Sequence, residues 1–243
     1  MKNVDVVIIS WAKDDYLKDV TKKGLDSLFQ SESEEIAFHA YVIESNPLVD
    51  YNEYQNIGER HTCTTIHPED KIFGYNKYLN IGVNQGKSEY VALCNNDLIY
   101  EKNWASEIIK VMEEFPDLLS ASPWCPQTQG DNKNHEGKTY IGYRIRVEVA
   151  GWCIFQNREI YQIIEKLDES LTFWYSDNIY SDEIRIRGIK HGLVANSLVN
   201  HHENNIGKTC QTLESETIRS YTTEESKIYT RRIKELTDKF EIQ

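Results

Sequence analysis

The sequence predicts an α/β fold in which one doubly wound, mostly parallel sheet is covered by helices. The 243 residues are 40% hydrophobic and 27% charged, a globular composition with enough length for one sizeable core. Nearly continuous apolar runs over residues 4–10, 37–44 and 89–94 are typical of strands buried on both faces. Segments with apolar residues at helical spacing alternate with these runs, as they do around a parallel sheet.

The N-terminal half supplies three predicted strands and three predicted helices. The first strand is residues 4–10 (VDVVIIS), and a helix follows Asp14 and Asp15. The second strand, residues 37–44, ends at Ser45-Asn46-Pro47. A helix begins near Tyr75 and stops near Gly86, a suitable C-terminal cap. The third strand, residues 89–94, precedes a helix over residues 104–115 that Pro116 terminates.

The C-terminal half is less regular. We expect a long polar surface loop over residues 123–140, which is a length often associated with function. The elements expected after it are a strand over 146–155, helices over 158–167 and from about 177 to 191, and a strand over 193–200. A charged tail with apolar residues near helical spacing predicts a final helix that packs on the domain. We expect a single domain, residues 1–243, composed of halves 1–118 and 119–210 and a helical tail 211–243.

Charge and cysteine usage narrow the class of protein. The net charge of −12 argues against a broad, sequence-independent grip on nucleic acid. One polar segment does concentrate basic residues, and we interpret it as a solvated loop: Lys133, Lys138, Arg144 and Arg146. The five cysteines form no CxxC pair, which favours free thiols in a reducing compartment. The first apolar segment contains an acid and no run suits a membrane span, so we expect a cytoplasmic protein.

Polar clusters follow each of the first three predicted strands. They are Ser10-Trp11, Glu44-Ser45-Asn46 and Asn95-Asn96-Asp97. Open α/β sheets bind ligands beyond the carboxyl ends of their strands. Together the clusters predict a nucleotide site at that edge.

Motif order and spacing add a resemblance. VVIISW, AYVIESN and YVALCNND resemble the first three strands of family 2-type GT-A glycosyltransferases, and Asn76…Asn80-Ile81-Gly82 resembles their Asn-x-Gly helix. AGWCIFQNREIYQIIEKLDES and FWYSDNIYSDEIRIRGIKHGLVANSLVNHH resemble the acceptor half of the same family, so the likeness spans most of the chain. The chain departs from the pattern in three ways. It lacks the usual basic residue before Asn76, it has no QxxRW signature, and its DxD-type motif is reduced to Asn95-x-Asp97.

The resemblance implies a GT-A-like fold, with residues 1–118 binding a nucleotide-sugar and residues 119–210 carrying the acceptor and catalytic groups. Its implied donor-binding residues are Ser10, Trp11, Glu44, Asn76, Asn95 and Asn96. Asp97 is the predicted metal ligand, because a hard cation such as Mn²⁺ or Mg²⁺ prefers oxygen and neutralises a departing diphosphate. His201 is the predicted second ligand, with His202 as the alternative.

An inverting transfer also needs a base for the acceptor hydroxyl. We predict Asp177 for this role, with Asp182 in reserve and Glu183 a third candidate. Asp177 also stands where a helix N-cap is expected, so capping is the alternative interpretation. The acceptor is expected near Gly151, Trp152 and Trp174.

The predicted function is metal-dependent, inverting transfer of a sugar, from a UDP-sugar by preference, to a saccharide or glycan hydroxyl. One alternative is a hydroxymethylated base in DNA as acceptor. Another is a non-catalytic nucleotide- or glycan-binding protein of the same fold, which Asn95 makes credible. A sugar-phosphate nucleotidyltransferase would need a glycine-rich phosphate loop after the first strand, and WAKDDYLKD contains no glycine.

Overall fold

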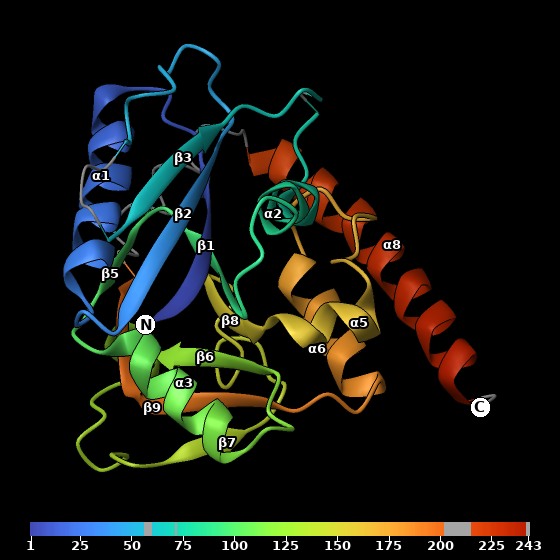
Figure 1. The fold of residues 1–243 in the computed structure, drawn as a ribbon. Coiled ribbons are helices and arrows are strands. Elements are labelled where there is room, and N and C mark those ends of the chain that lie inside the picture. Colours follow the sequence, from blue (N-terminus) through green and yellow to red (C-terminus); the bar gives the residue numbers. More distant parts are fainter. Residues whose placement is uncertain (56–59, 71, 202–214, 242–243) are drawn as a thin grey trace.

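A central sheet organises the molecule, and helices lie on both of its faces (Figure 1). The computed structural model describes residues 1–55, 60–70, 72–201 and 215–241. The strands are β1 (Lys2–Ser10), β2 (Ile36–Glu44), β3 (Thr62–Ile66), β4 (Tyr90–Asn95), β5 (Leu98–Tyr100), β6 (Ser120–Trp124), β7 (Thr139–Ile141), β8 (Cys153–Asn157) and β9 (His191–His201). The helices are α1 (Asp15–Gln30), α2 (Tyr75–Val83), α3 (Trp104–Glu114), α4 (Pro126–Gln129), α5 (Tyr161–Ile164), α6 (Ser176–Ile186) and α8 (Ser215–Glu241), with a 3₁₀ turn, η1 (Arg158–Ile160), before α5.

Sheet topology confirms the predicted α/β class. The strand order is β3-β2-β1-β4-β8-β6-β9-β5, with β7 paired to β9. The four N-terminal strands β3, β2, β1 and β4 are parallel. The continuous apolar sequences of β1, β2 and β4 predicted those three strands, whereas β3 (TCTTI) was not expected from the sequence. β8 runs antiparallel to both β4 and β6, so the second half of the sheet mixes directions.

Strand alternation divides the core between the two faces. Val4, Val6 and Ile8 of β1 pack in a cluster that includes residues of α1 and α3. Val7 points the other way, into a cluster with residues of α2, α5 and α6. Asp14 caps α1 by accepting a hydrogen bond from the N–H of Leu17 at 2.9 Å, where the sequence predicted the helix to begin.

Several local expectations in the second half are wrong. The helix expected to run to about residue 191 ends at Ile186, and His191 begins β9. The stretch 123–140 is not a continuous loop, because β6 runs to Trp124 and α4 and the start of β7 follow. The predicted strand over 146–155 is only β8, since the Arg144 carbonyl accepts the N–H groups of Val147, Glu148 and Val149 in a tight turn. The helix over 158–167 is shorter, because Glu165 adopts a left-handed backbone (φ 65°) directly after α5. These are local hydrogen-bonding and backbone choices that hydrophobic periodicity does not encode.

The C-terminal helix α8 lies along α6, at the side of the molecule away from α1 (Figure 1). The sequence predicted this packing from the apolar positions of the tail. None of the helices in the described part of the chain combines the length and hydropathy that crossing a bilayer requires.

Candidate functional site

The three polar strand ends lie side by side at one edge of the sheet. Ser10 is the register partner of Glu44 between β1 and β2, and Ile9 is the partner of Asn95 between β1 and β4. The end of β9 also reaches this region, because His201 pairs with Leu98 of β5, next to Asp97. The edge therefore gathers groups that are far apart in sequence, at the place where open α/β sheets bind ligands.

Ser10, Trp11 and Asn96 form one corner of this edge. The Ser10 hydroxyl lies 3.1 Å from that of Thr21, and the Asn96 side-chain amide donates to the same Thr21 oxygen at 2.9 Å. Trp11 is half exposed, with the Lys13 ammonium 5.4 Å from its ring centroid. This corner thus combines hydrogen-bonded polar side chains with the exposed ring of Trp11.

The Glu44 carboxylate is buried, and both of its oxygens accept hydrogen bonds from other residues of the protein. Its side chain has no exposed surface, and one oxygen accepts the N–H groups of Ala12 and Asn46 at 3.1 and 2.8 Å. The Tyr54 hydroxyl donates to the other oxygen at 3.1 Å. Glu44 therefore holds the loops after β1 and β2 together, and its contact with a nucleotide base stays a prediction that would require Tyr54 to move aside.

Asp97 and His201 are in contact at this edge. Nε2 of His201 lies 3.3 Å from Oδ1 of Asp97, and both side chains are largely buried. The Trp152 ring stacks on His201 at 5.3 Å between centroids, which holds the imidazole plane. Although the two atoms are close, Nε2 forms no hydrogen bond with any residue that the structure describes. His202, the alternative ligand, lies outside the described residues.

This pair fits a hard divalent cation. The Asp97 carboxylate is the kind of ligand that Mn²⁺ prefers, and Nε2 of His201, which has no hydrogen bond to a described residue, can serve as a second ligand. No group of three or more His, Cys, Asp or Glu side chains with metal-binding geometry occurs among the described residues. Mg²⁺ and similar ions commonly take their remaining ligands from substrate phosphates and water, so two protein ligands suffice for a nucleotide site. Asn95 contributes differently, because its side-chain oxygen accepts the Tyr75 hydroxyl at 2.8 Å.

The structure separates the three candidate bases. Asp182 pairs with Arg185 at 2.8 Å and accepts the Tyr229 hydroxyl, so both of its oxygens serve contacts on α6 and α8. Glu183 is buried and pairs with Arg187 at 2.8 Å. Asp177 forms no ion pair among the described residues, although the charge of Arg146 acts to lower its pKa, and its Oδ1 accepts the N–H of Asn178 at 2.9 Å. Burial raises the pKa of the Asp177 carboxyl above its usual range.

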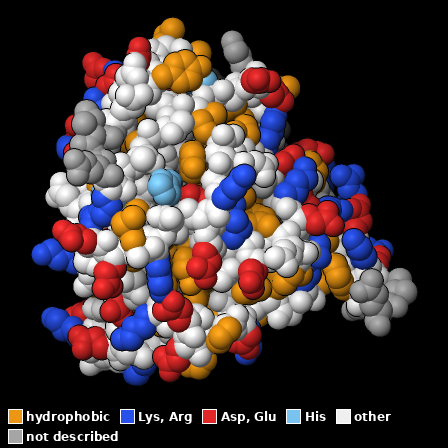
Figure 2. Space-filling model, in the orientation of Figure 1, with side chains coloured by type: hydrophobic (Ala, Val, Ile, Leu, Met, Phe, Trp, Pro, Cys, Tyr) orange, Lys and Arg blue, Asp and Glu red, His pale blue; other side chains and the backbone are white. Residues whose placement is uncertain are grey.

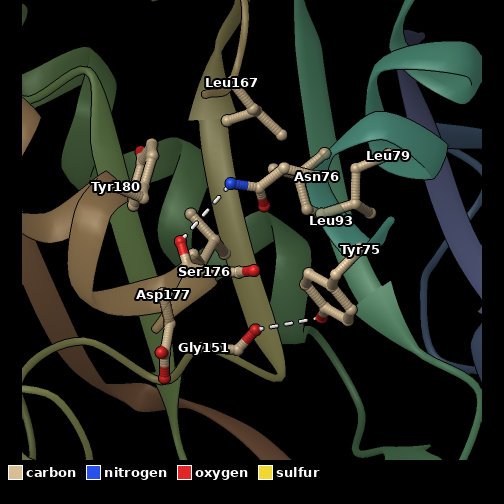
Figure 3. Close-up of a pocket in the computed structure, with 10 residues that line it drawn as sticks. Tyr75, Asn76, Leu79, Leu93, Gly151, Leu167, Ser176, Asp177 and Tyr180 are labelled. Carbon is tan, nitrogen blue, oxygen red and sulfur yellow. Dashed lines mark hydrogen bonds between the residues drawn. The ribbon is translucent and has the colours of Figure 1, made fainter. Parts of the chain in front are cut away.

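Asp177 borders a small cavity that Tyr75, Asn76, Gly151 and Ser176 also line (Figure 3). Figure 3 shows its carboxylate directed away from the apolar leucines of the cavity. Gly151 makes room for this side chain, since a Cβ at position 151 would lie 2.6 Å from both Cβ and Oδ2 of Asp177. The alternative interpretation of Asp177 as the N-cap is wrong, because Tyr175 occupies the N-cap of α6 and Asp177 lies within its first turn.

The remaining predicted residues have mainly supporting contacts. The Asn76 amide donates to the Asp168 carbonyl at 2.8 Å and is buried, so it fastens α2 to the segment before α6. Trp152 is 8% exposed beneath His201, which leaves little of its surface for an acceptor. Trp174 is half-buried beside Phe173, which is the more exposed ring.

Sequence reasoning missed two residues that connect the site. Tyr75 was counted only as an apolar helix position, yet its hydroxyl bridges Asn95 and the Gly151 carbonyl at 2.8 and 3.3 Å. Tyr54 lies in a loop with no motif and covers Glu44. No sequence signal marks either role, because both depend on which distant groups the fold brings near.

Comparison with solved structures shows the fold. The chain is similar to S. aureus TarS 1–349 (13% identity, TM-score 0.61, 83% of this chain and 60% of that chain). It is also similar to TarS 1–349 in complex with UDP-GlcNAc (14%, 0.59, 82% and 58%). A third similar structure is GalNAc-T7 with UDP, GalNAc and Mn²⁺ (14%, 0.65, 82% and 43%). These are GT-A glycosyltransferases, so the predicted GT-A-like fold is confirmed.

The chain spans between about two fifths and three fifths of the length of these structures. No protein-family model matches the chain, and no curated protein matches it.

Proposed function

We propose that this protein is a glycosyltransferase that moves a sugar from a UDP-sugar to an acceptor hydroxyl with inversion at the anomeric carbon. The observation that carries the proposal is the contact between Asp97 and His201 at the edge where the strand ends converge, where Nε2 of His201 has no hydrogen bond to any described residue. Asp177 lies close to this pair, because it packs against Gly151 and the next residue, Trp152, stacks on His201. The solved GT-A structures bound to UDP or UDP-GlcNAc support the choice of donor.

Asp97 and His201 would hold Mn²⁺ or Mg²⁺, which when bound supplies positive charge to the diphosphate. Trp152 keeps the His201 ring in place by stacking. Ser10, Trp11, Asn95 and Asn96 would border the nucleotide, with Glu44 maintaining the loops around it. In this arrangement the chain's own contacts preorganise the donor site.

Asp177 acts on the acceptor. Its carboxylate takes the proton of the acceptor hydroxyl while that oxygen forms a bond to the anomeric carbon. The bond from that carbon to the phosphate oxygen breaks, and UDP departs with the electron pair. The acceptor is a saccharide or glycan in this proposal, and the exposed Phe173 and half-buried Trp174 offer ring surfaces next to Asp177.

The proposal requires that UDP binding depend on a divalent cation. We expect tight UDP binding in calorimetry with Mn²⁺ and a large loss of affinity in EDTA, because the diphosphate charge is then uncompensated. Asp97→Ala should bind UDP equally weakly in both conditions. Asp117→Ala is the matched control, since Asp117 is an exposed carboxylate paired with Lys190. Equal wild-type affinity with Mn²⁺ and with EDTA would contradict the metal role.

A further inference from the structure

Helix α8 presents three side chains to the segment that leads into α6. Glu225, Tyr229 and Arg232 follow the i, i+4, i+7 spacing that places residues on one face of a helix. Each contacts a residue or backbone group between 168 and 182. The C-terminal helix is therefore attached to the segment that carries Asp177.

Glu225 makes the most unusual of these contacts. Its side chain is 4% exposed, and its oxygens accept the backbone N–H groups of Thr172 and Trp174 at 2.6 Å and of Phe173 at 3.1 Å. No Lys or Arg in the described ranges pairs with this carboxylate. Burying a carboxylate is costly unless hydrogen bonds compensate, and bonds to a charged acceptor are the strong ones. The backbone N–H groups of residues 172–174 therefore converge on the carboxylate of Glu225, which α8 provides.

Two further contacts hold the same segment. The Tyr229 ring stacks on Tyr175 at 5.2 Å and 15°, and its hydroxyl donates to Asp182. Tyr175 has a left-handed backbone (φ 64°), a conformation that a non-glycine residue keeps only when its surroundings enforce it. Arg232 donates to Asp168 at 2.6 Å.

Hydrogen bonds connect this segment to the sheet edge. The Thr172 carbonyl accepts the N–H of Tyr75 at 2.7 Å. The Tyr75 hydroxyl in turn donates to Asn95 at 2.8 Å, at the end of β4. These two bonds fix the segment relative to the strand ends, so a change in the conformation of residues 172–174 would displace Asp177 relative to a donor bound there.

We propose that Glu225 is a positioning residue that fixes residues 172–177, so that Asp177 and the Phe173 ring face a donor bound at the strand ends. This inference rests on the proposed glycosyl transfer and assigns part of its acceptor side to the C-terminal helix. Glu225 touches neither donor nor acceptor and acts through the backbone of the segment. Its loss lowers the rate of transfer without weakening the binding of UDP.

Glu225→Gln tests the proposal, because the amide keeps the shape but removes the charge and turns an N–H donor toward backbone donors. Hydrogen–deuterium exchange at residues 172–174 should speed up by about tenfold or more, as local opening becomes easier. The kcat for hydrolysis of UDP-sugars with Mn²⁺, in which water is the acceptor, should fall by about tenfold or more when Asp177 is misplaced. The Kd for UDP with Mn²⁺ should change by less than about twofold.

Two further variants complete the test. All proteins are assayed well below the lowest Tm among them. Glu225→Asp retains the carboxylate and should recover part of the lost kcat. Glu224→Gln is the matched control, because Glu224 is the neighbouring, 66% exposed residue that pairs with Lys227 and should change nothing. Unchanged exchange at 172–174 in Glu225→Gln, or a parallel loss of kcat and UDP affinity, would overturn the inference. A wild-type chain that does not bind UDP refutes the proposed function instead, and the exchange experiment then still decides whether Glu225 holds the segment.

Discussion

Asp177 owes its chemical character to its surroundings. Burial raises the pKa of its carboxyl, and Gly151 leaves the space that the side chain occupies. Asp182 and Glu183 lie on the same helix, but Arg185, Tyr229 and Arg187 engage them. A carboxylate without an ion pair and with a raised pKa is the better proton acceptor.

Replacing Asp177 should separate catalysis from donor binding. We expect Asp177→Asn to lower kcat by about 10²- to 10⁴-fold, the usual loss when a general base is removed, with UDP affinity nearly unchanged. Wild-type kcat should fall as pH drops through the Asp177 pKa, because only the deprotonated carboxylate accepts the proton. Burial raises this pKa above the ordinary value of 3.8, so the fall in kcat on the acid side should occur at a higher pH than for an exposed aspartate. The variant should lack this fall in a pH–rate profile. Near-normal turnover in Asp177→Asn together with collapse in Asp182→Asn would transfer the role to Asp182.

Secondary-structure elements are joined by a buried polar network behind the site. The Ser120 hydroxyl of β6 lies 2.7 Å from both Nδ1 of His191 in β9 and the Tyr180 hydroxyl of α6. The Gln156 amide of β8 donates to the same Tyr180 oxygen at 2.8 Å. Nε2 of His191 lies 3.1 Å from the Glu148 carbonyl. The network thus links three strands, one helix and the 144–149 turn.

His191 should make this junction sensitive to acid. Burial lowers the pKa of His191 to about 4, below its ordinary value of 6.5, so the unfolded chain binds the proton more readily. Stability contributed by neutral His191 is complete above pH 6.5 and is lost as pH falls toward 4. Between pH 7 and 5 the loss is about 2 kcal/mol, at 1.36 kcal/mol per pH unit.

Urea unfolding of wild type and His191→Gln at pH 7 and pH 5 measures this effect. The variant lacks the titrating group, so the stability difference between the two proteins should shrink at pH 5. His39→Gln is a control, because His39 is a less buried histidine on β2. Equal differences at both pH values would show that His191 is not responsible.

At the scale of the whole molecule, charge bears on the choice of acceptor. The net charge is −12, and Figure 2 shows acidic and basic side chains interspersed on the face displayed. Two of the four basic residues in the 133–146 segment are paired, Lys133 with Asp131 at 3.5 Å and Arg144 with Glu148. The segment therefore presents less positive charge than its sequence suggested, which favours an acceptor other than duplex DNA.

We accordingly expect weak binding to duplex DNA, with a Kd of about 10⁻⁴ to 10⁻⁶ M or weaker at physiological salt. Fluorescence anisotropy with plain and hydroxymethylated duplexes measures it directly. The control replaces Lys133, Lys138, Arg144 and Arg146 by Gln together. Tight binding that weakens steeply with salt and disappears in this variant would identify a DNA-modifying enzyme.

The sequence by itself determined the α/β class, three of the four parallel N-terminal strands (β1, β2 and β4) and the helix starts at Asp15, Tyr75 and Trp104. It also predicted which strand ends would be polar. These features follow from local periodicity and from the rule that parallel strands end at one edge. Asp97 and His201 were chosen through a family resemblance, and their roles in binding a metal stay predictions.

Only the tertiary structure decided how those groups are surrounded. It placed Nε2 of His201 beside Asp97 and buried Glu44 under Tyr54. It also joined Asp182 to α8, while Asp177 forms no ion pair within the part of the chain that the structure describes. It also brought Glu225 to the backbone of residues 172–174. Burial and hydrogen-bond partners depend on contacts between residues distant in the chain. Local sequence pattern carries no record of those contacts, so it could propose the candidate groups but could not choose among them.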